Sequence, residues 1–322
     1  MIKNRIAGAL AVALMATVGA TAQAAAYPDK PVTVIVGFSP GGFTDVVARL
    51  LSRHLEQRLG QTFVVENKPG AAGTIAANMV AKSAPDGYTL LLAHSNSNAT
   101  APALYKDLPY DVNKDFTPVA MVASTPLILT VTPKLGVKNM DEFMTLAKKK
   151  SLRYASSGVG SSQHLAAAQF GKAANIELLH IPYKGSAQAL NDLLSGEVDM
   201  NVDSPPLMVP NIKAGKLVGI AVVSPKRIPL LPDVPTMKES GYPDVTMGQW
   251  FGVVGPKGMP PEIAQKLNEN INQILQIPEV KKVLADKGAE AGGGSPADFA
   301  KQIREDTISI QKVVDDAGIK IE

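Results

Sequence analysis

Continuous apolar segments of strand length alternate with amphipathic helical segments in two parts of the chain, and this alternation limits the fold more than any other feature. The first part begins at Val32-Thr33-Val34-Ile35-Val36, continues through a helical pattern at 44–59, and ends with a strand pattern at 88–93. A second such part lies within 140–223. Apolar strands separated by helices are typical of a parallel sheet covered on both faces. The sequence therefore predicts an α/β protein with parallel-rich sheets and helices on both faces.

Two long extended runs, 119–132 and 245–255, connect these parts. They predict a discontinuous first domain, formed by 27–124 and 247–322, into which a second domain, 125–246, is inserted. A cleft between two domains is a preferred place for small ligands, and two chain crossings form a natural hinge. We therefore expect a ligand cleft between the domains.

Residues 1–26 have the features of a secretory signal peptide. Lys3 and Arg5 give a positive start, an apolar core follows at 6–18, and Ala24 and Ala26 form a small-residue cleavage site before Tyr27. Cleavage near Ala26, or alternatively after Ala24, predicts export to the periplasm.

The composition excludes several classes of function. Removing residues 1–26 takes the basic count from 32 to 30, against 29 acidic residues, so no basic surface for nucleic acid is expected. The chain has no cysteine, and its four histidines show no metal-binding spacing. No nucleotide-binding G-x-x-x-x-G-K-[ST] motif is present. We expect neither a metal nor a cofactor.

The segment Gly37-Phe38-Ser39-Pro40-Gly41-Gly42-Phe43-Thr44-Asp45 lies between the first strand pattern and the first helical pattern. The first turn of a helix has unpaired N–H groups and the positive end of the helix dipole, and glycines allow an anion to approach closely. This segment therefore predicts one wall of a cleft for a small carboxylate or phosphate.

Four similar segments, rich in Gly, Ser, Thr and Asn, follow other predicted strands: 67–74, 94–100 with Ser95, 156–162 and 183–186. Ligands in open parallel sheets bind beyond the carboxyl ends of the strands, where such loops gather. Each serine or threonine alone is explained as a helix cap. Taken together, the five loops predict a polar cleft.

The same first loop also matches G-x-S-x-G, the nucleophile elbow of α/β-hydrolases, with Ser39 as nucleophile. Two features argue against a hydrolase. Pro40 has no N–H for an oxyanion hole, and too few residues precede Ser39 for the earlier strands of that fold. A triad of Ser161, His164 and Asp203 is conceivable from the sequence, but triads are recognised by geometry, and a histidine at this helical position is typical of a structural role.

The ordered motifs of the chain resemble those of one known family. They are Tyr27-Pro28-Asp29-Lys30-Pro31, Pro40-Gly41-Gly42-Phe43-Thr44-Asp45, Val65-Glu66-Asn67-Lys68-Pro69-Gly70, Pro85-Asp86-Gly87-Tyr88-Thr89-Leu90, Leu108-Pro109-Tyr110-Asp111, Tyr154-Ala155-Ser156, Gly160-Ser161, His164-Leu165, Pro182-Tyr183-Lys184-Gly185, Ile212-Lys213-Ala214-Gly215-Lys216-Leu217 and Leu231-Pro232-Asp233-Val234-Pro235-Thr236. In these stretches the chain resembles the substrate-binding proteins of tripartite tricarboxylate transporters, also called the Bug family, over essentially all of 27–322.

The resemblance implies a two-domain, periplasmic binding protein-like (type II) fold that closes around a carboxylate. The family's first-strand loop maps onto Phe38, Ser39, Gly42, Thr44 and Asp45, and its second-domain loop maps onto Ser156, Gly158, Gly160, Ser161 and Ser162. Asp203 falls where the family often has an aspartate facing the cleft. The chain departs from the family at Asn201-Val202-Asp203 and at Gly37-Phe38-Ser39, so the identity of the ligand does not carry over.

We therefore expect a non-enzymatic, monomeric binding protein that captures a small mono- or dicarboxylate and presents it transiently to membrane transporter subunits. Backbone N–H groups and hydroxyls would hold the carboxylate, Phe38 would form an apolar wall, and Asp203 would accept from a ligand amine or hydroxyl. A module that senses the same ligand for a membrane signalling partner remains the alternative.

Overall fold

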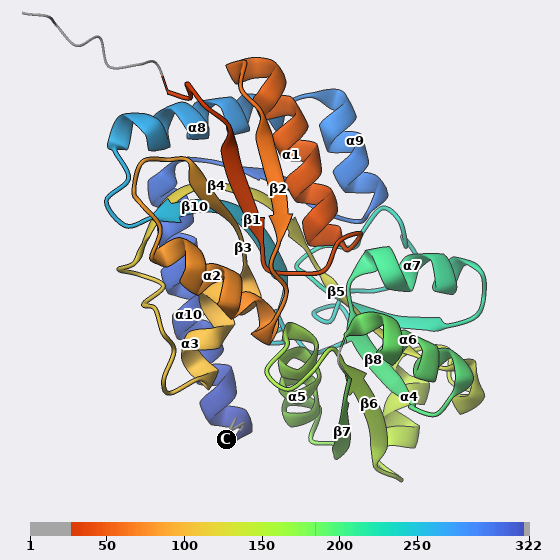
Figure 1. The fold of residues 1–322 in the computed structure, drawn as a ribbon. Coiled ribbons are helices and arrows are strands. Elements are labelled where there is room, and N and C mark those ends of the chain that lie inside the picture. The colour runs from red at the N-terminus through yellow and green to blue at the C-terminus, as the bar shows by residue number, and fades with distance from the viewer. Residues whose placement is uncertain (1–26, 184, 319–322) are drawn as a thin grey trace, which may run out of the picture.

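The computed structural model describes residues 27–183 and 185–318, so the predicted signal peptide lies outside the described residues. The chain forms two β-sheets, of six and five strands, each with helices on both faces (Figure 1). We call the part built on the six-stranded sheet the first lobe and the part built on the five-stranded sheet the second lobe.

The six-stranded sheet has the order β11-β4-β10-β3-β1-β2. Its strands are β1 (Val32–Val36), β2 (Phe63–Asn67), β3 (Thr89–His94), β4 (Phe116–Thr125), β10 (Gln249–Pro256) and β11 (Glu290–Gly293). Strand β1 pairs in parallel with β2 and β3. Strand β10 is antiparallel to both β3 and β4, and β11 is antiparallel to β4.

The five-stranded sheet has the order β7-β6-β8-β5-β9. Its strands are β5 (Leu127–Val131), β6 (Leu152–Ser156), β7 (Leu178–Pro182), β8 (Met200–Asp203) and β9 (Val218–Val223). Strand β6 pairs in parallel with β7 and β8, whereas β5 is antiparallel to β8 and β9. In each sheet, three parallel strands are followed by one antiparallel strand, β10 beside β3 in the first sheet and β5 beside β8 in the second.

Helices pack on both faces of each sheet. They are α1 (Phe43–Leu59), α2 (Thr74–Ala81), α3 (Ala101–Leu104), α4 (Met140–Ala147), α5 (Ser162–Ala174), α6 (Ser186–Ser195), α7 (Pro205–Lys213), α8 (Pro261–Ile274), α9 (Pro278–Asp286) and α10 (Pro296–Ala317), with short helical turns η1 (Ala71–Gly73), η2 (Asn96–Thr100) and η3 (Pro133–Leu135). None of the helices in the described part of the chain has the length and hydropathy needed to cross a membrane.

Helix α1 shows how the sequence pattern positions the first predicted loop. Val47, Leu51 and Leu55, spaced four residues apart, are buried against the sheet, as the pattern predicts. The helix ends at Gly60, which adopts a left-handed φ of 72° and donates its N–H to Glu56 O, an arrangement that favours glycine. Anchored along this face, the helix begins at the carboxyl end of β1.

Helix α10 connects the two lobes. It starts with a capping box, in which Ser295 and Asp298 satisfy each other's backbone N–H groups. Its apolar residues Phe299 and Ile303 belong to the same hydrophobic cluster as Phe143 and Phe170 of the second lobe. Near its end, Asp316 forms an ion pair of 3.3 Å with Lys172 of α5. One continuous core therefore runs through both lobes on the α10 side.

The structure differs from the sequence expectations in three places. Fewer strand pairs are parallel than we expected, because the crossing strands β5 and β10 enter antiparallel. Helix α7 was not predicted; Pro205 occupies its first helical turn, where its missing N–H costs nothing. The segment after β3, expected as an open loop, is a buried helical turn, η2, that continues into α3.

Gly252, in the middle of β10, tests how tightly the first lobe is packed. A Cβ atom at this position would lie 2.2 Å from Phe299 Cζ and 2.9 Å from Ala120 O. We expect Gly252→Ala to lower the free energy of unfolding by about 1–3 kcal/mol through overpacking, measured by urea denaturation. Gly248→Ala is the matched control, because the nearest atom to its Cβ is Thr125 O at 3.6 Å. Equal stability of the two variants would contradict this packing.

Candidate functional site

The loop between β1 and α1 leaves the start of α1 open to solvent. Gly42 is the N-cap residue of α1, and no side chain caps the helix. Ser39, Gly41 and Gly42 are exposed, whereas Thr44 is buried. The first N–H groups of an uncapped helix are free donors next to the positive end of the dipole. The loop is therefore able to bind an anion with its backbone.

Asp45 holds this loop in shape. Its carboxylate accepts hydrogen bonds from Gly41 N at 3.0 Å, Arg49 Nε at 2.9 Å and Asn67 Nδ2 at 2.9 Å. Burial alone would raise the pKa of the Asp45 carboxyl, but these hydrogen bonds outweigh burial and hold the pKa below its usual value. Because Arg49 neutralises its charge, Asp45 does not cancel the positive character of the α1 start.

Phe38 forms an apolar wall beside the loop. Its ring lies 4.8 Å from that of His94, centroid to centroid, and its carbonyl accepts a hydrogen bond from Asn67 Nδ2 at 3.0 Å. Burial lowers the pKa of His94 to about 3, so this histidine is neutral at ordinary pH. The wall therefore has no formal charge.

The loop between β6 and α5 is the second predicted loop, in the second lobe, and internal hydrogen bonds hold its shape. Ser161 caps α5 by accepting from His164 N at 3.3 Å, and its hydroxyl donates to Gly158 O at 2.8 Å. Gly160 has a φ of 76°, a conformation that L side chains rarely adopt, which explains the glycine in this tight turn. Ser156, Gly160, Ser161 and Ser162 are buried, and Gly158 is partly exposed.

Two stacked histidines support this second loop from behind. The rings of His164 and His180 are 3.9 Å apart and nearly parallel, at 10°. His164 Nδ1 accepts from Gly160 N at 3.0 Å, and His180 Nε2 lies 2.7 Å from Ser156 Oγ. Burial lowers the pKa of each to about 4, and in His164 the proximity of His180 contributes to this lowering. The stack and the accepted N–H require His164 to be neutral.

Asp203 lies at the end of β8, and only one of its two carboxylate oxygens accepts hydrogen bonds. Its Oδ1 accepts from Ser204 N at 2.7 Å and Gln163 Nε2 at 3.2 Å. Its Oδ2 is buried and has no hydrogen-bond partner among the described residues, as is true of both side-chain amide atoms of Asn201. Burial raises the pKa of the Asp203 carboxyl, although these hydrogen bonds oppose the rise.

The crossing strand β10 contacts the second loop directly. Gln249 Nε2 donates to Ser162 Oγ at 2.7 Å, across the junction of the two lobes. The sequence did not identify Gln249, Gln163 or His180 as site residues. Gln249 and His180 lie far along the chain from the β6–α5 loop, so no local pattern indicates their contact, whereas Gln163 directly follows Ser162 in the sequence.

The structure brings the predicted residues together in two separate groups. One group is the loop of the first lobe, with Phe38, Ser39, Gly42, Thr44 and Asp45; the other is the loop of the second lobe, with Ser156, Gly158, Gly160, Ser161, Ser162 and Asp203 nearby. Among the described residues, no hydrogen bond or ion pair joins residues 38–45 to 156–162. Ser95 is buried at the start of η2 and lines a cavity of about 840 Å³ that neither loop lines.

The geometry does not assemble the hypothetical triad. The Ser161 hydroxyl donates to Gly158 O rather than to His164, and His164 Nδ1 is occupied by Gly160 N. Asp203 contacts Gln163 and Ser204 instead of a histidine. No group of three or more His, Cys, Asp or Glu residues in the described part of the chain is arranged to hold a metal ion.

Comparison with known proteins identifies the relatives of the chain. The family model described as tripartite tricarboxylate transporter family receptor matches residues 47–319. The structure of the periplasmic binding protein BugD has a TM-score of 0.82 and 36% identity, covering 92% of this chain and 100% of BugD. These matches confirm the resemblance and the two-domain fold expected from the sequence.

Two further solved structures carry ligands in their descriptions. Rpa4515 of R. palustris, described with adipate, has a TM-score of 0.85 and 37% identity over 91% of this chain and 99% of its own. MatC (Rpa3494) of Rhodopseudomonas palustris, described with bound malate, has a TM-score of 0.80 and 34% identity over 89% of this chain and 100% of its own. The matching proteins are receptors and binding proteins rather than enzymes, so the hydrolase alternative at Ser39 gains no support.

The neutral histidines predict how stability depends on pH. Burial depresses the pKa of His94, His164 and His180, so unfolding below about pH 6.5 lets each take up a proton that the folded state excludes. We expect the free energy of unfolding to fall as the pH drops from about 6.5 to 5, by up to about 1.4 kcal/mol per pH unit for each histidine. Urea denaturation at several pH values measures this slope.

His180→Gln isolates the contribution of the stack. The variant removes one titrating group, so its slope over the same pH range should be shallower than that of the unchanged protein. The variant also loses packing, which lowers the free energy of unfolding by a similar amount at every pH. Comparing the slopes against pH therefore separates the loss of the titrating group from the loss of packing. An unchanged slope would mean that His180 is protonated in the folded protein.

Proposed function

Because the chain belongs to the tripartite tricarboxylate transporter family of receptors, we propose that it captures a small mono- or dicarboxylate between its two lobes. Adipate and malate, named with two solved relatives, are both small dicarboxylates. They favour this ligand class over phosphates and sugars for a chain that is 34–37% identical to those relatives.

The observation that carries the proposal is the uncapped start of α1. Its exposed glycines allow a carboxylate to approach the N–H groups without crossing a side chain. In this arrangement one carboxylate of the ligand would bind to the first lobe, and the β6–α5 loop would close over the other end. The ligand-binding residues would be Phe38, Ser39, Gly42, Thr44, Asp45, Ser95, Ser156, Gly158, Gly160, Ser161, Ser162 and Asp203. Asp45 would act by holding the β1–α1 loop in shape, and Ser95 would lie at the edge of the ligand site.

The unpartnered oxygen of Asp203 suggests what else the ligand carries. A buried carboxylate oxygen without a donor is costly, so a hydroxyl or amine on the ligand would stabilise it. Phe38 would pack against the carbon chain of the ligand. A hydroxylated or amino dicarboxylate satisfies both features.

The division of the chain suggests how the cleft closes. We propose that 27–124 and 247–322 form one rigid lobe, that 125–246 form the other, and that the connections between them act as the hinge. The ligand would supply the energy of closure through its preference for the closed form. The closed, monomeric protein, exported after cleavage near Ala26 to the periplasm, would then deliver the ligand to membrane subunits of the transporter.

A thermal-shift screen of residues 27–322 tests the ligand class. Malate, adipate and other small mono- and dicarboxylates, present at about 100 times their dissociation constant, should each stabilise the protein by roughly 2.7 kcal/mol. Inorganic phosphate, glucose and divalent metal ions are the controls and should leave the melting temperature unchanged. A shift with the controls alone would disprove the carboxylate assignment.

Gly42→Val tests the role of the α1 start. The valine would cover the approach to the first N–H groups, so the affinity for the best carboxylate should fall at least about tenfold, a loss of about 1.4 kcal/mol, measured by calorimetry. Stability should be retained, because the nearest atom to an added Cβ is Ser39 O at 3.6 Å and the backbone at Gly42 is extended. Full affinity in a stably folded variant would place the ligand elsewhere.

A further inference from the structure

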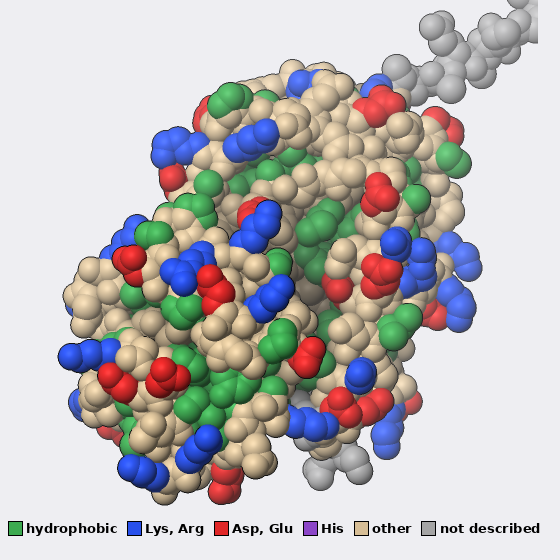
Figure 2. All heavy atoms as spheres, turned by 180° about the vertical axis from the view of Figure 1, so that it is seen from behind, with side chains coloured by type: hydrophobic (Ala, Val, Ile, Leu, Met, Phe, Trp, Pro, Cys, Tyr) green, Lys and Arg blue, Asp and Glu red, His purple; other side chains and the backbone are tan. Residues whose placement is uncertain are grey.

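A cavity lies between the lobes, beside β10 and α10. It has a volume of about 840 Å³, within the range typical of small-molecule sites. None of the residues 38–45 or 156–163 lines it. Figure 2 shows the molecule from behind, with a hollow between the lobes in which hydrophobic side chains are visible. Ser95 apart, the cavity therefore shares no lining residue with the proposed carboxylate site.

Both lobes contribute walls to the cavity. The first lobe contributes one side of α10, including Asp306 and Ile310, and the turn around Gly288; the second contributes 223–230 and Gln169. Gly288 lies against the start of α7, where an added Cβ would be 2.4 Å from Pro205 Cβ.

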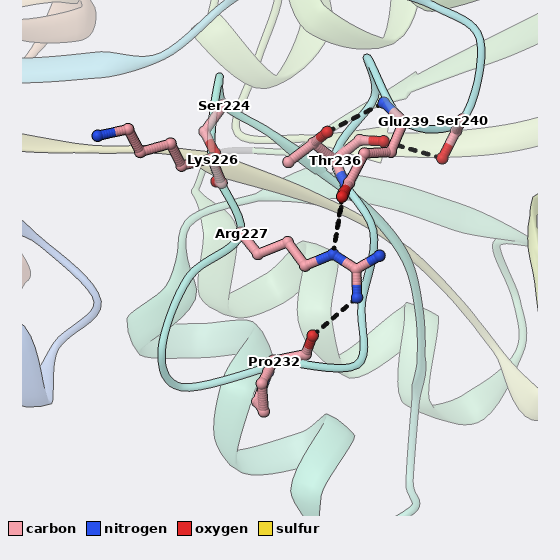
Figure 3. A network of polar contacts seen from close by, with 7 residues as sticks. All are labelled: Ser224, Lys226, Arg227, Pro232, Thr236, Glu239 and Ser240. Atoms are coloured by element: carbon pink, nitrogen blue, oxygen red, sulfur yellow. Dashed lines mark hydrogen bonds and ion pairs between the residues drawn. The ribbon is translucent and has the colours of Figure 1, made fainter.

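The second-lobe wall is held in place by its own network of polar contacts. Arg227 donates to both carboxylate oxygens of Glu239, at 3.0 and 3.1 Å, and to Pro232 O at 3.0 Å (Figure 3). Glu239 in turn accepts from Thr236 N at 2.7 Å. Lys226 extends away from this network in the same view. The wall is therefore organised before any ligand arrives.

The charged residues around the cavity are mostly acidic. Three acids, Asp286, Glu290 and Asp306, line it together with a single basic residue, Lys226. Asp286 already pairs with Lys282 at 2.7 Å. The remaining excess of negative charge favours a cationic occupant.

Asp306 is the most deeply placed of these acids. Its Oδ2 accepts from Trp250 Nε1 at 2.7 Å and its Oδ1 accepts from Gln302 Nε2 at 2.9 Å, both neutral donors. No Lys, Arg or His of the described chain forms an ion pair with it, and burial raises the pKa of its carboxyl. A carboxylate oxygen can accept more than one hydrogen bond, so both oxygens can receive a further donor.

A second acceptor and an apolar body complete the site. Gln169 Oε1 is buried without a hydrogen-bond partner among the described residues, while its Nε2 donates to Asp244 O at 2.9 Å. Met121, Met247, Ile310 and Val313 supply apolar walls, and the indole of Trp250 lies beside Asp306. A carboxylate next to an aromatic ring is a combination that recognises organic ammonium groups.

We propose that this cavity is a second binding site, which takes an organic ammonium ion with an apolar body. The ammonium group donates to Asp306, and the apolar body fills the space between α10 and the 223–230 wall. The proposal is independent of the carboxylate function, because the two sites share no proposed contact except Ser95 at the margin.

The single tryptophan of the chain, Trp250, makes the site directly measurable. Its indole lines the cavity, so an occupant should change its fluorescence. We expect 2-phenylethylammonium to change the emission of residues 27–322 in a saturable way. The uncharged 2-phenylethanol and the anionic phenylacetate should bind at least tenfold more weakly. Equal binding of the alcohol, or no saturable change with the ammonium ion, would overturn the proposal.

Asp306→Asn removes the charge while keeping the size of the side chain, and should weaken 2-phenylethylammonium binding at least tenfold. Asp315→Asn is the matched control, since it removes the same charge from the same helix at a residue that bonds Gln311 and does not line the cavity. Val313→Phe fills the cavity without changing its charge and should also weaken binding. If Asp306→Asn alters the Trp250 emission before ligand is added, calorimetry replaces fluorescence as the measure of affinity for all variants. Unchanged affinity in Asp306→Asn, or equal loss in Asp315→Asn, would contradict the site.

Discussion

The antiparallel insertion of β10 into the six-stranded sheet is the constraint on which the rest of the structure depends. The strand is buried along its whole length and hydrogen-bonded to β3 on one side and β4 on the other. Strand β4 leads within two residues into β5 of the second sheet, while β10 follows the chain's return from that sheet. The inserted lobe is therefore connected to the centre of the first lobe rather than to its edge, and any change in lobe angle must be absorbed at Pro126 and in the segment 224–248.

Strand β10 contacts both candidate sites through neighbouring residues. Gln249 is bonded to Ser162 at the start of α5 and also lines the cavity beside α10. Trp250 lines the same cavity and is bonded to Asp306 of α10. A short stretch of β10 therefore connects the β6–α5 loop with α10.

The parts of the fold that local patterns specify were predictable from the sequence. Strand β1 and helix α1 follow from a continuous apolar run and from Val47, Leu51 and Leu55 at helical spacing. Helix α7 escaped prediction because Pro210 in its interior contradicts the usual helical signal. The buried turn η2 escaped because Asn96 and Asn98 are polar, although the packing of α3 and α10 around them removes them from water. Such contacts join residues distant in the chain, where no local pattern operates.

The candidate site was predictable only as far as its backbone. Glycines and serines after strands indicated the two loops, but two of the side chains that support them, Arg49 in one lobe and His180 in the other, had no local signal. His164 and His180, which support the second loop, are both neutral, so they add no formal charge to the candidate site. A protonated His164 would hold an anion strongly by charge, but it would also lose the N–H of Gly160 and repel His180 at 3.9 Å. Burial keeps both rings neutral, so an anion at this loop would be bound by oriented N–H groups whose strength does not change with pH near neutrality. Selection among anions then depends on how many N–H donors each ligand oxygen contacts. This number is set by the shape of the ligand, so a carboxylate of fitting length is favoured over a more highly charged ion.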